Sequence, residues 1–123
     1  MLAIPFLNHC GIERIEVSPQ RAVYAVDAID PLTNSRDAAH GGLLMTLLDV
    51  TLGQAVLGAT EGATSFATIQ MNIDFIKPGQ GHIRAVGRVL RTGQSLAFAE
   101  GEIRDADGDL VAKASGIFKV LRV

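Results

Sequence analysis

The stretch HGGLLMTLLDVTLGQAVLGA, residues 40–59, is the longest apolar run in the 123-residue chain. Leucine and valine recur along it at helical spacing, and smaller apolar residues fill the other sides. A helix that is apolar on nearly all its faces is buried, either in a protein core or in a membrane. The run carries one acid, Asp49. A buried carboxylate costs several kcal/mol unless it is paired, hydrated or neutralised, so Asp49 requires either a partner or a function.

A membrane-spanning helix needs about 20 predominantly apolar residues, and this run is long enough to be one. However, residues 41–60 contain Asp49, Gln54, three threonines and four glycines. A central aspartate costs about 2.5 to 3.5 kcal/mol on insertion scales. Because the remainder of the chain is rich in strands, we expect a helix enclosed by a sheet and no membrane span.

Composition and length restrict the class of protein. The length predicts a single domain over residues 1–123, and 48% hydrophobic residues with a mean hydropathy of +0.28 exclude disorder. A net charge of −2 gives no bulk attraction to nucleic acid. The single cysteine, Cys10, rules out an internal disulfide and fits a reducing cytoplasm. The first residues, MLAIPFLNHCG, lack the basic start and long apolar core of a signal peptide.

The segments around the helix show strand and turn signals. Residues 11–17 and 21–29 predict two short strands, with Pro19 in the turn between them. Residues 30–39 are turn formers and predict a loop, after which the helix is expected over residues 40–58. Residues 82–91, 95–104 and 110–121 predict an antiparallel meander, with a hairpin signal at Asp107 and Gly108.

Residues 66–77 form the clearest predicted strand. Strict alternation assigns one face to Ala67, Ile69, Met71, Ile73 and Phe75, and the other to Thr68, Gln70, Asn72 and Asp74. One antiparallel sheet wrapped around one long central helix accounts for all these features, which is an α+β fold. The strand over residues 66–77 is long and regular. If it lies at the sheet edge, pairing with a second copy would cover it.

The His-Gly-Gly start, the apolar helix and the acid nine residues after the histidine resemble the hotdog-fold acyl-CoA thioesterases, most closely the phenylacetate-pathway type. The resemblance extends to TIQMNIDFIKPG after the helix and to RTGQSLAFAEGEIRDADGDLVAKASGIF near the end, so it covers nearly the whole chain. It implies a hotdog fold and hydrolysis of acyl-CoA thioesters to free acid and CoA, without metal or cofactor.

The resemblance also implies roles for residues at the helix. Asp49 matches the catalytic carboxylate, which serves as a nucleophile that forms a mixed anhydride or as a general base for water. The sequence does not distinguish the nucleophile from the general base. A purely structural role for Asp49 would need a partner, and no Lys or Arg lies within one helical turn of it. Gly41 matches the backbone N–H donor to the thioester oxygen, which becomes negative in the transition state beside the positive end of the helix dipole.

Other residues have both a functional and a plainer interpretation. The resemblance gives His40 a positioning role, Asn34 a contact near the thioester and Thr68 a part in orienting the water. A capping histidine, a turn-forming asparagine and an ordinary strand threonine stay open as alternatives. The substrate is expected to contact Gly42, Met45 and Leu48, and its CoA phosphates are expected near Lys77 and Arg91. The three histidines and one cysteine show no metal-ligand spacing.

The spacing within the helix has a consequence for assembly. His40 and Asp49 are separated by a rise of about 13.5 Å, whereas reacting atoms must approach to about 3 to 3.5 Å. Gly41 and Asp49 of one chain therefore cannot act on one thioester. Two antiparallel helices related by a two-fold axis could combine them, which predicts a homodimer with two composite sites. We expect the protein to work as this dimer or as a dimer of dimers, which is a homotetramer. An acyl-thioester hydratase or dehydratase, or a non-catalytic acyl-CoA-binding protein, are the alternatives on the same fold.

Overall fold

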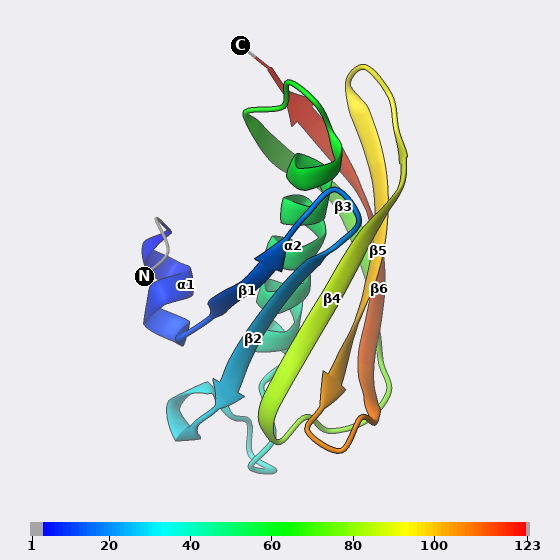
Figure 1. Ribbon diagram of the computed structural model, residues 1–123. Coiled ribbons are helices and arrows are strands. Elements are labelled where there is room, and N and C mark those ends of the chain that lie inside the picture. The colour runs from blue at the N-terminus through cyan, green and yellow to red at the C-terminus, as the bar shows by residue number, and fades with distance from the viewer. Residues whose placement is uncertain (1–3, 123) are drawn as a thin grey trace.

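The computed structural model describes residues 4–122 and places one long helix against a six-stranded antiparallel sheet (Figure 1). The elements in chain order are α1 (Pro5–Cys10), β1 (Glu13–Val17), β2 (Ala22–Ala28), a 3-10 turn η1 (Asp30–Leu32), α2 (Gly41–Ala59), β3 (Ser65–Phe75), β4 (Gly81–Thr92), β5 (Leu96–Asp105) and β6 (Leu110–Leu121). The predicted α+β architecture is confirmed.

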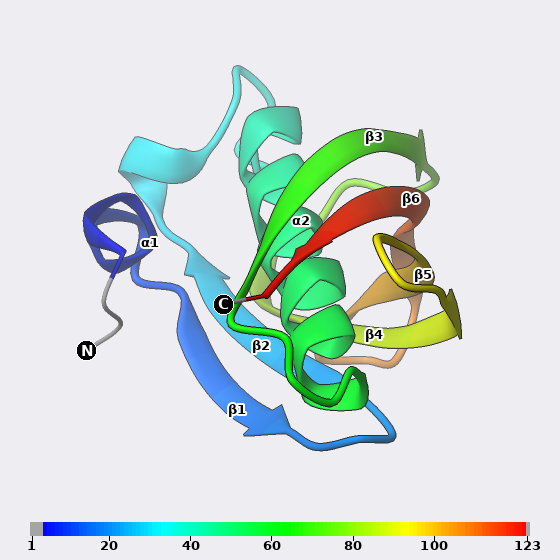
Figure 2. The ribbon, with the colours of Figure 1, turned by 90° about the horizontal axis from the view of Figure 1, so that it is seen from above.

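The strands lie in the order β1-β2-β4-β5-β6-β3, and the sheet curves around α2 (Figure 2). The predicted meander is confirmed, because β4 pairs with β5 and β5 pairs with β6, both antiparallel. After α2 the chain does not return to β2. It crosses to the far side of the sheet, where β3 pairs with β6. This crossover makes β3 one edge of the sheet and β1 the other.

Helix α2 fits against the inner face of the sheet because that face carries small side chains. Leu47, Leu48 and Leu52 are fully buried there. A Cβ on Gly101 of β5 would lie 2.7 Å from the Leu52 Cδ1 atom, so the absence of a side chain lets the leucine lie against the strand. The sheet residues that give α2 room are Ala22, Ala85, Ala97, Ala99, Ala112 and Ala114.

By length and composition alone, α2 could cross a membrane. In the fold, 56% of its apolar window is buried inside the protein, as in the core helix of a globular domain. The helix is therefore enclosed by the sheet, as expected from the sequence.

Strand β3 departs from the predicted alternation because it contains a bulge. Thr68 is opposite Phe118 of β6, but Gln70 is opposite Ile117, so Ile69 has no partner in the ladder. Directly opposed residues of an antiparallel pair lie on the same face, and Phe118 is fully buried. Thr68 therefore faces α2, and the prediction that it shares a face with Gln70, Asn72 and Asp74 was wrong.

Beyond the bulge the predicted alternation holds. Met71, Ile73 and Phe75 are opposite small inward residues of β6, whereas Ala67 and Ile69, which were predicted on the same face, do not join them. Side chains in a strand alternate between the two faces of the sheet, so one extra residue at the bulge exchanges the faces of all the β3 side chains before it.

The remaining differences from the predictions are at the N-terminus and the element ends. The sequence did not predict α1, which has Pro5 in its first turn and ends at Gly11 with φ 77°, and which buries Leu7 and Cys10. Strand β1 consequently begins at Glu13, two residues later than predicted. The predicted loop over residues 30–39 contains the short turn η1.

We expect Gly53→Ala to lower the free energy of unfolding by about 1 kcal/mol, because overpacking of a filled site typically costs about 2 kcal/mol and alanine regains about 1 kcal/mol of helix propensity. An added Cβ would lie 2.1 Å from the Phe66 ring of β3. That ring is held edge-on against Phe118, with centroids 5.8 Å apart, so it cannot move without losing this contact.

Urea unfolding measures this effect. Gly41→Ala is the matched control, because its Cβ would lie 3.6 Å from the Phe75 ring, which is ordinary contact. A Gly53→Ala protein that is as stable as the wild type would show that Phe66 repacks freely.

Candidate active site

The start of α2 presents one free backbone donor. His40 is the N-cap residue, and its Nδ1 accepts a hydrogen bond from the Gly42 N–H at 2.8 Å. The His40 carbonyl accepts from the N–H groups of Leu43 and Leu44. Within residues 4–122 the Gly41 N–H has no acceptor. The capping interpretation of His40 is therefore what the structure shows, and Gly41 rather than Gly42 has an N–H available to a ligand.

Gly41 opens onto a cavity of about 320 Å³. Leu44, Phe75 and Ile76 give it an apolar wall, and the Phe75 ring lies against Gly41. The sequence did not reveal Phe75 or Ile76 as lining residues, because their place beside Gly41 depends on how β3 ends over α2. It also did not reveal Arg36, which belongs to the loop before α2. The complete lining is Asn34, Arg36, Ala38, Ala39, Gly41, Leu44, Phe75, Ile76, Lys77, Pro78 and Gly79.

The loop before α2 is folded around Asn34. The Oδ1 atom of Asn34 accepts from the N–H of Arg36 at 2.8 Å and of Ala38 at 3.3 Å. Asp37 in this turn has φ 58°, in the left-handed region that favours glycine. The turn-forming interpretation of Asn34 is thus observed, and the residue also lines the cavity. Its expected contact near a thioester stays a prediction.

Asp49 is half-buried on the side of α2 that lies beneath β3. The Thr68 hydroxyl donates a hydrogen bond of 2.6 Å to its Oδ1 atom. In the described part of the chain Asp49 has no ion-pair partner. The bulge in β3 produces this contact, since it turns Thr68 toward the helix. The hydroxyl fixes one carboxylate oxygen and leaves the other open.

The two candidate groups are separate within one chain. Gly41 and Asp49 are eight residues apart, which is about 12 Å along a helix. Asp49 does not line the cavity at Gly41. Both positions lie beneath β3, with Phe75 over the first and Thr68 over the second. Met45 lies between them on α2 and is 48% exposed.

The predicted substrate-binding residues occupy different environments. Gly42 and Met45 are exposed on α2, and Arg91 is exposed near the end of β4. Leu48 is fully buried in the core, so in this structure it has no surface open to a substrate. Lys77 lines the cavity, but its ammonium contacts two carboxylates, which raise its pKa. The substrate contacts expected of these residues stay predictions.

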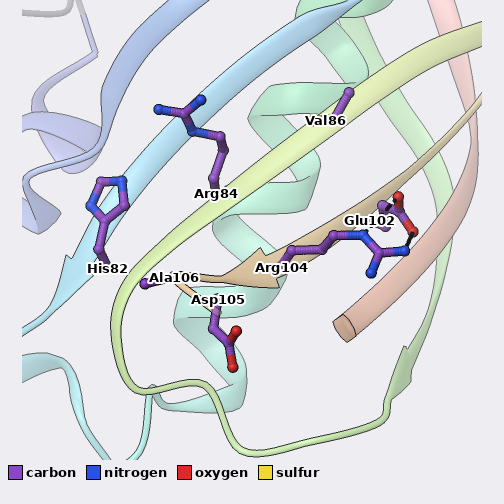
Figure 3. A pocket seen from close by; sticks show the side chains of 7 residues that line it. All are labelled: His82, Arg84, Val86, Glu102, Arg104, Asp105 and Ala106. Carbon is purple, nitrogen blue, oxygen red and sulfur yellow. Dashed lines mark hydrogen bonds and ion pairs between the residues drawn. The ribbon is translucent and has the colours of Figure 1, made fainter. Parts of the chain in front are cut away.

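A second hollow, of about 400 Å³, lies on the outer face of the sheet, away from α2 (Figure 3). Its charged groups are largely paired: His82 contacts Asp27 at 2.9 Å, and Arg104 contacts Glu102 at 3.2 Å. Arg84 and Arg104 extend in different directions and do not converge on one point (Figure 3). The His82 side chain is 50% exposed. This hollow shows no catalytic arrangement.

Comparison with known proteins gives one consistent family. The profile of the thioesterase superfamily matches residues 37–112. SSO2140 of Saccharolobus solfataricus, whose name assigns esterase activity provisionally, is 34% identical over 90% of this chain and 79% of its own length. The Salmonella typhimurium medium/long-chain acyl-CoA thioesterase YigI is 27% identical, over 66% of this chain and 61% of its own.

The fold is also known. The Escherichia coli PaaI protein, from the phenylacetic acid degradation operon, superposes with a TM-score of 0.88, covering 97% of this chain and 86% of its own. At 21% identity this likeness shows the fold alone. Together with the family match it confirms the predicted hotdog fold and the resemblance to the thioesterases.

Three aspartates gather in the hairpin between β5 and β6. Carboxylate oxygens of Asp105, Asp107 and Asp109 all lie within 4.8 Å of one another. The Asp105 Oδ1 atom accepts from the N–H groups of Asp107 and Asp109, both at 3.0 Å. The Lys77 ammonium contacts the Oδ2 atoms of Asp105 and Asp109. The protein itself thus occupies both carboxylate oxygens of Asp105 and one of Asp109.

We expect added Ca²⁺ or Mg²⁺ to leave the melting temperature unchanged, because the Lys77 ammonium and two backbone N–H groups already occupy both carboxylate oxygens of Asp105 and one of Asp109. Dialysis against EDTA should likewise change neither stability nor activity, as the lack of metal-ligand spacing in the sequence predicts. Thermal unfolding with and without each ion measures this. A rise in melting temperature with one cation, lost in Asp107→Ala, would contradict the expectation.

Proposed function

The chain belongs to the thioesterase superfamily, and from this premise we propose that it hydrolyses the thioester of an acyl-CoA to free acid and CoA. The relative YigI, named as a medium/long-chain acyl-CoA thioesterase, supports CoA thioesters as the substrate class.

The observation that carries the proposal is the Asp49–Thr68 hydrogen bond of 2.6 Å. A half-buried carboxylate with no cationic partner in residues 4–122 does not stabilise the fold through an ion pair. A hydroxyl orients it instead and leaves one oxygen free to react. This is the arrangement that a catalytic base or nucleophile needs, since its position is fixed and its charge is not cancelled.

Two reaction routes fit these residues. As a general base, Asp49 takes a proton from water while the water oxygen bonds to the acyl carbon, and the C–S bond then breaks to release the CoA thiolate, which takes up a proton. As a nucleophile, a carboxylate oxygen bonds to the acyl carbon, the thiolate leaves, and water hydrolyses the mixed anhydride. On either route the carbonyl oxygen becomes negative, and the free Gly41 N–H at the helix start stabilises it.

We propose that the site is composite, because about 12 Å of helix separates Gly41 from Asp49 in one chain. A two-fold axis that brings Gly41 of one copy to Asp49 of the other must pass α2 near Met45, the midpoint of the two positions. Met45 is a large apolar residue that is 48% exposed. A second copy packed on this side would cover it.

Strand β3 supports the same axis. It is an edge strand, so its outer backbone groups are free to pair with another strand. An axis that exchanges the two site positions relates Phe75 of one β3 to Thr68 of the other. It crosses the strand near Met71 and Asn72. Antiparallel pairing of two β3 strands would also cover Ile69, which is 55% exposed.

We further propose that two such dimers associate. The outer face of the sheet carries an apolar area around a hollow of about 200 Å³, where Leu90 is 56% and Phe98 is 39% exposed.

Acyl-CoA and the unpaired Cys10 both fit a cytoplasmic location, which is part of the same proposal.

Replacement of Asp49 by alanine should reduce turnover by about a hundredfold or more, the range for losing a general base. The protein should stay folded, because removal of a half-buried charge costs little packing. Release of free thiol from a panel of short, long and aromatic acyl-CoAs measures the rate, and thermal unfolding checks the fold. Full activity in Asp49→Asn would refute the catalytic role. Binding of acyl-CoA by the wild type without any thiol release would favour a non-catalytic binder or a hydratase.

The composite site predicts recovery of activity when two inactive variants are mixed. Asp49→Ala removes the carboxylate, and Gly41→Pro removes the N–H. Proline is tolerated at the first helical position, and His40, with ψ 142°, already has the backbone conformation that precedes proline. Each homodimer should be inactive. After joint unfolding and refolding, half the dimers should be mixed, each with one intact site, so activity should return to about a quarter of wild type.

Thermal unfolding and size measurement must first establish that both variants are folded and dimeric. Each chain in the mixture carries a lesion, so a site contained in one chain could not recover. Absence of activity in proven heterodimers would refute the composite site.

A further inference from the structure

We infer that Lys77, together with Asp105 and Asp109, is a positioning group that holds the Gly41 end of the active site in place. This inference rests on the proposed function, because it concerns the same oxyanion donor. It assigns Lys77 a role different from the phosphate contact that its place near a strand end suggests.

Lys77 is tied to the hairpin between β5 and β6. Its Nζ atom lies 2.9 Å from Asp105 Oδ2 and 2.7 Å from Asp109 Oδ2. The Asp105 side chain is only 10% exposed, and the Lys77 ammonium holds its pKa below the usual range. The backbone joins the same region, because the N–H groups of Ile76 and Lys77 both donate to the Val111 carbonyl.

The hairpin is a firm anchor. Besides Lys77, the Asp105 carboxylate accepts from two backbone N–H groups of the hairpin turn. The Arg104 guanidinium donates to the Gly108 carbonyl at 2.9 Å. These hydrogen bonds hold the turn between β5 and β6 in one conformation. The Lys77 ammonium, which contacts two aspartates of this turn, therefore has a defined position.

A short path leads from Lys77 to Gly41. Two residues after Lys77, the Gly79 carbonyl accepts a hydrogen bond of 2.7 Å from the Ala39 N–H. Ala39 is 4% exposed and lies two residues before Gly41. Lys77, Gly79, Ala39 and Gly41 all line the same cavity. A shift of residues 77–79 would therefore move the loop that leads into α2.

The local charge argues against a phosphate ligand. One ammonium faces two carboxylates, so this group carries a net charge of −1 before any ligand approaches, and Asp107 adds another negative charge nearby. An anion such as a CoA phosphate would meet repulsion there. The Lys77 and Asp109 side chains are 41% and 58% exposed, so water screens the Lys77 ammonium and its ion pairs stabilise the fold little. Their loss should therefore affect position more than stability.

The test measures kcat and KM for Lys77→Met, for Asp105→Asn/Asp109→Asn, and for all three changes combined. The expected result is a fall in kcat of about tenfold, because a misplacement of about 1 Å can cost up to about a hundredfold. KM should change little. The three changes together should cost no more than Lys77→Met alone, since they break one connection. Lys119→Met, an exposed lysine on the outer face of β6, is the matched control and should keep the wild-type rate.

Two further measurements separate positioning from phosphate binding. The fall in kcat should be equal with an acyl-pantetheine thioester, which carries no phosphate. Hydrogen exchange at the Ala39 amide should be faster in Lys77→Met than in wild type and unchanged in Lys119→Met.

An unchanged kcat, an unchanged Ala39 exchange rate, or a defect confined to KM for acyl-CoA and absent with acyl-pantetheine would each overturn the inference. If the wild type hydrolyses no thioester, the proposed function fails, and Ala39 exchange alone then decides whether Lys77 holds this loop.

Discussion

The burial of α2 is the constraint on which the rest of the structure depends. A helix that is apolar on nearly every side must be buried. A twisted sheet can wrap closely around such a helix only if the side chains on its inner face are small. Alanines on β2, β4, β5 and β6 meet that need, and they leave space for Leu47, Leu48 and Leu52. The enclosure is incomplete along one stripe of α2, where Met45 is 48% exposed and Asp49 is half-buried beside the edge strand β3.

Strand β3 converts that stripe into a candidate site. It lies over α2 at three places: Phe66 packs on Gly53, Thr68 bonds Asp49, and Phe75 lies against Gly41. The bulge between the first and last of these contacts allows a polar side chain to face the helix there without disturbing the apolar ones on either side. The same strand is free along its outer edge, so one element both orients the acid and offers the surface for a second copy.

Different hydrogen bonds hold the two ends of the proposed site, Asp49 and Gly41. At Asp49 a single hydroxyl from β3 sets the carboxylate. At Gly41 the His40 cap occupies the neighbouring N–H, and the loop before the helix is held by Asn34 and by the Gly79 carbonyl. Catalysis by fixed backbone dipoles requires such pre-arrangement, because a donor that must reorient loses part of its effect.

The sequence by itself determined the helix, the meander and the motif at His40, Gly41 and Asp49, because hydrophobic period and turn residues are local properties. It also showed that one chain cannot unite Gly41 with Asp49, since helical rise fixes their separation. The tertiary structure decided that Thr68 faces Asp49, that Leu48 is enclosed and that Lys77 meets Asp105 and Asp109. These facts depend on a bulge, on sheet order and on contacts between residues far apart in the chain. No local pattern encodes them, and a shift of one residue in register reverses which face a side chain occupies.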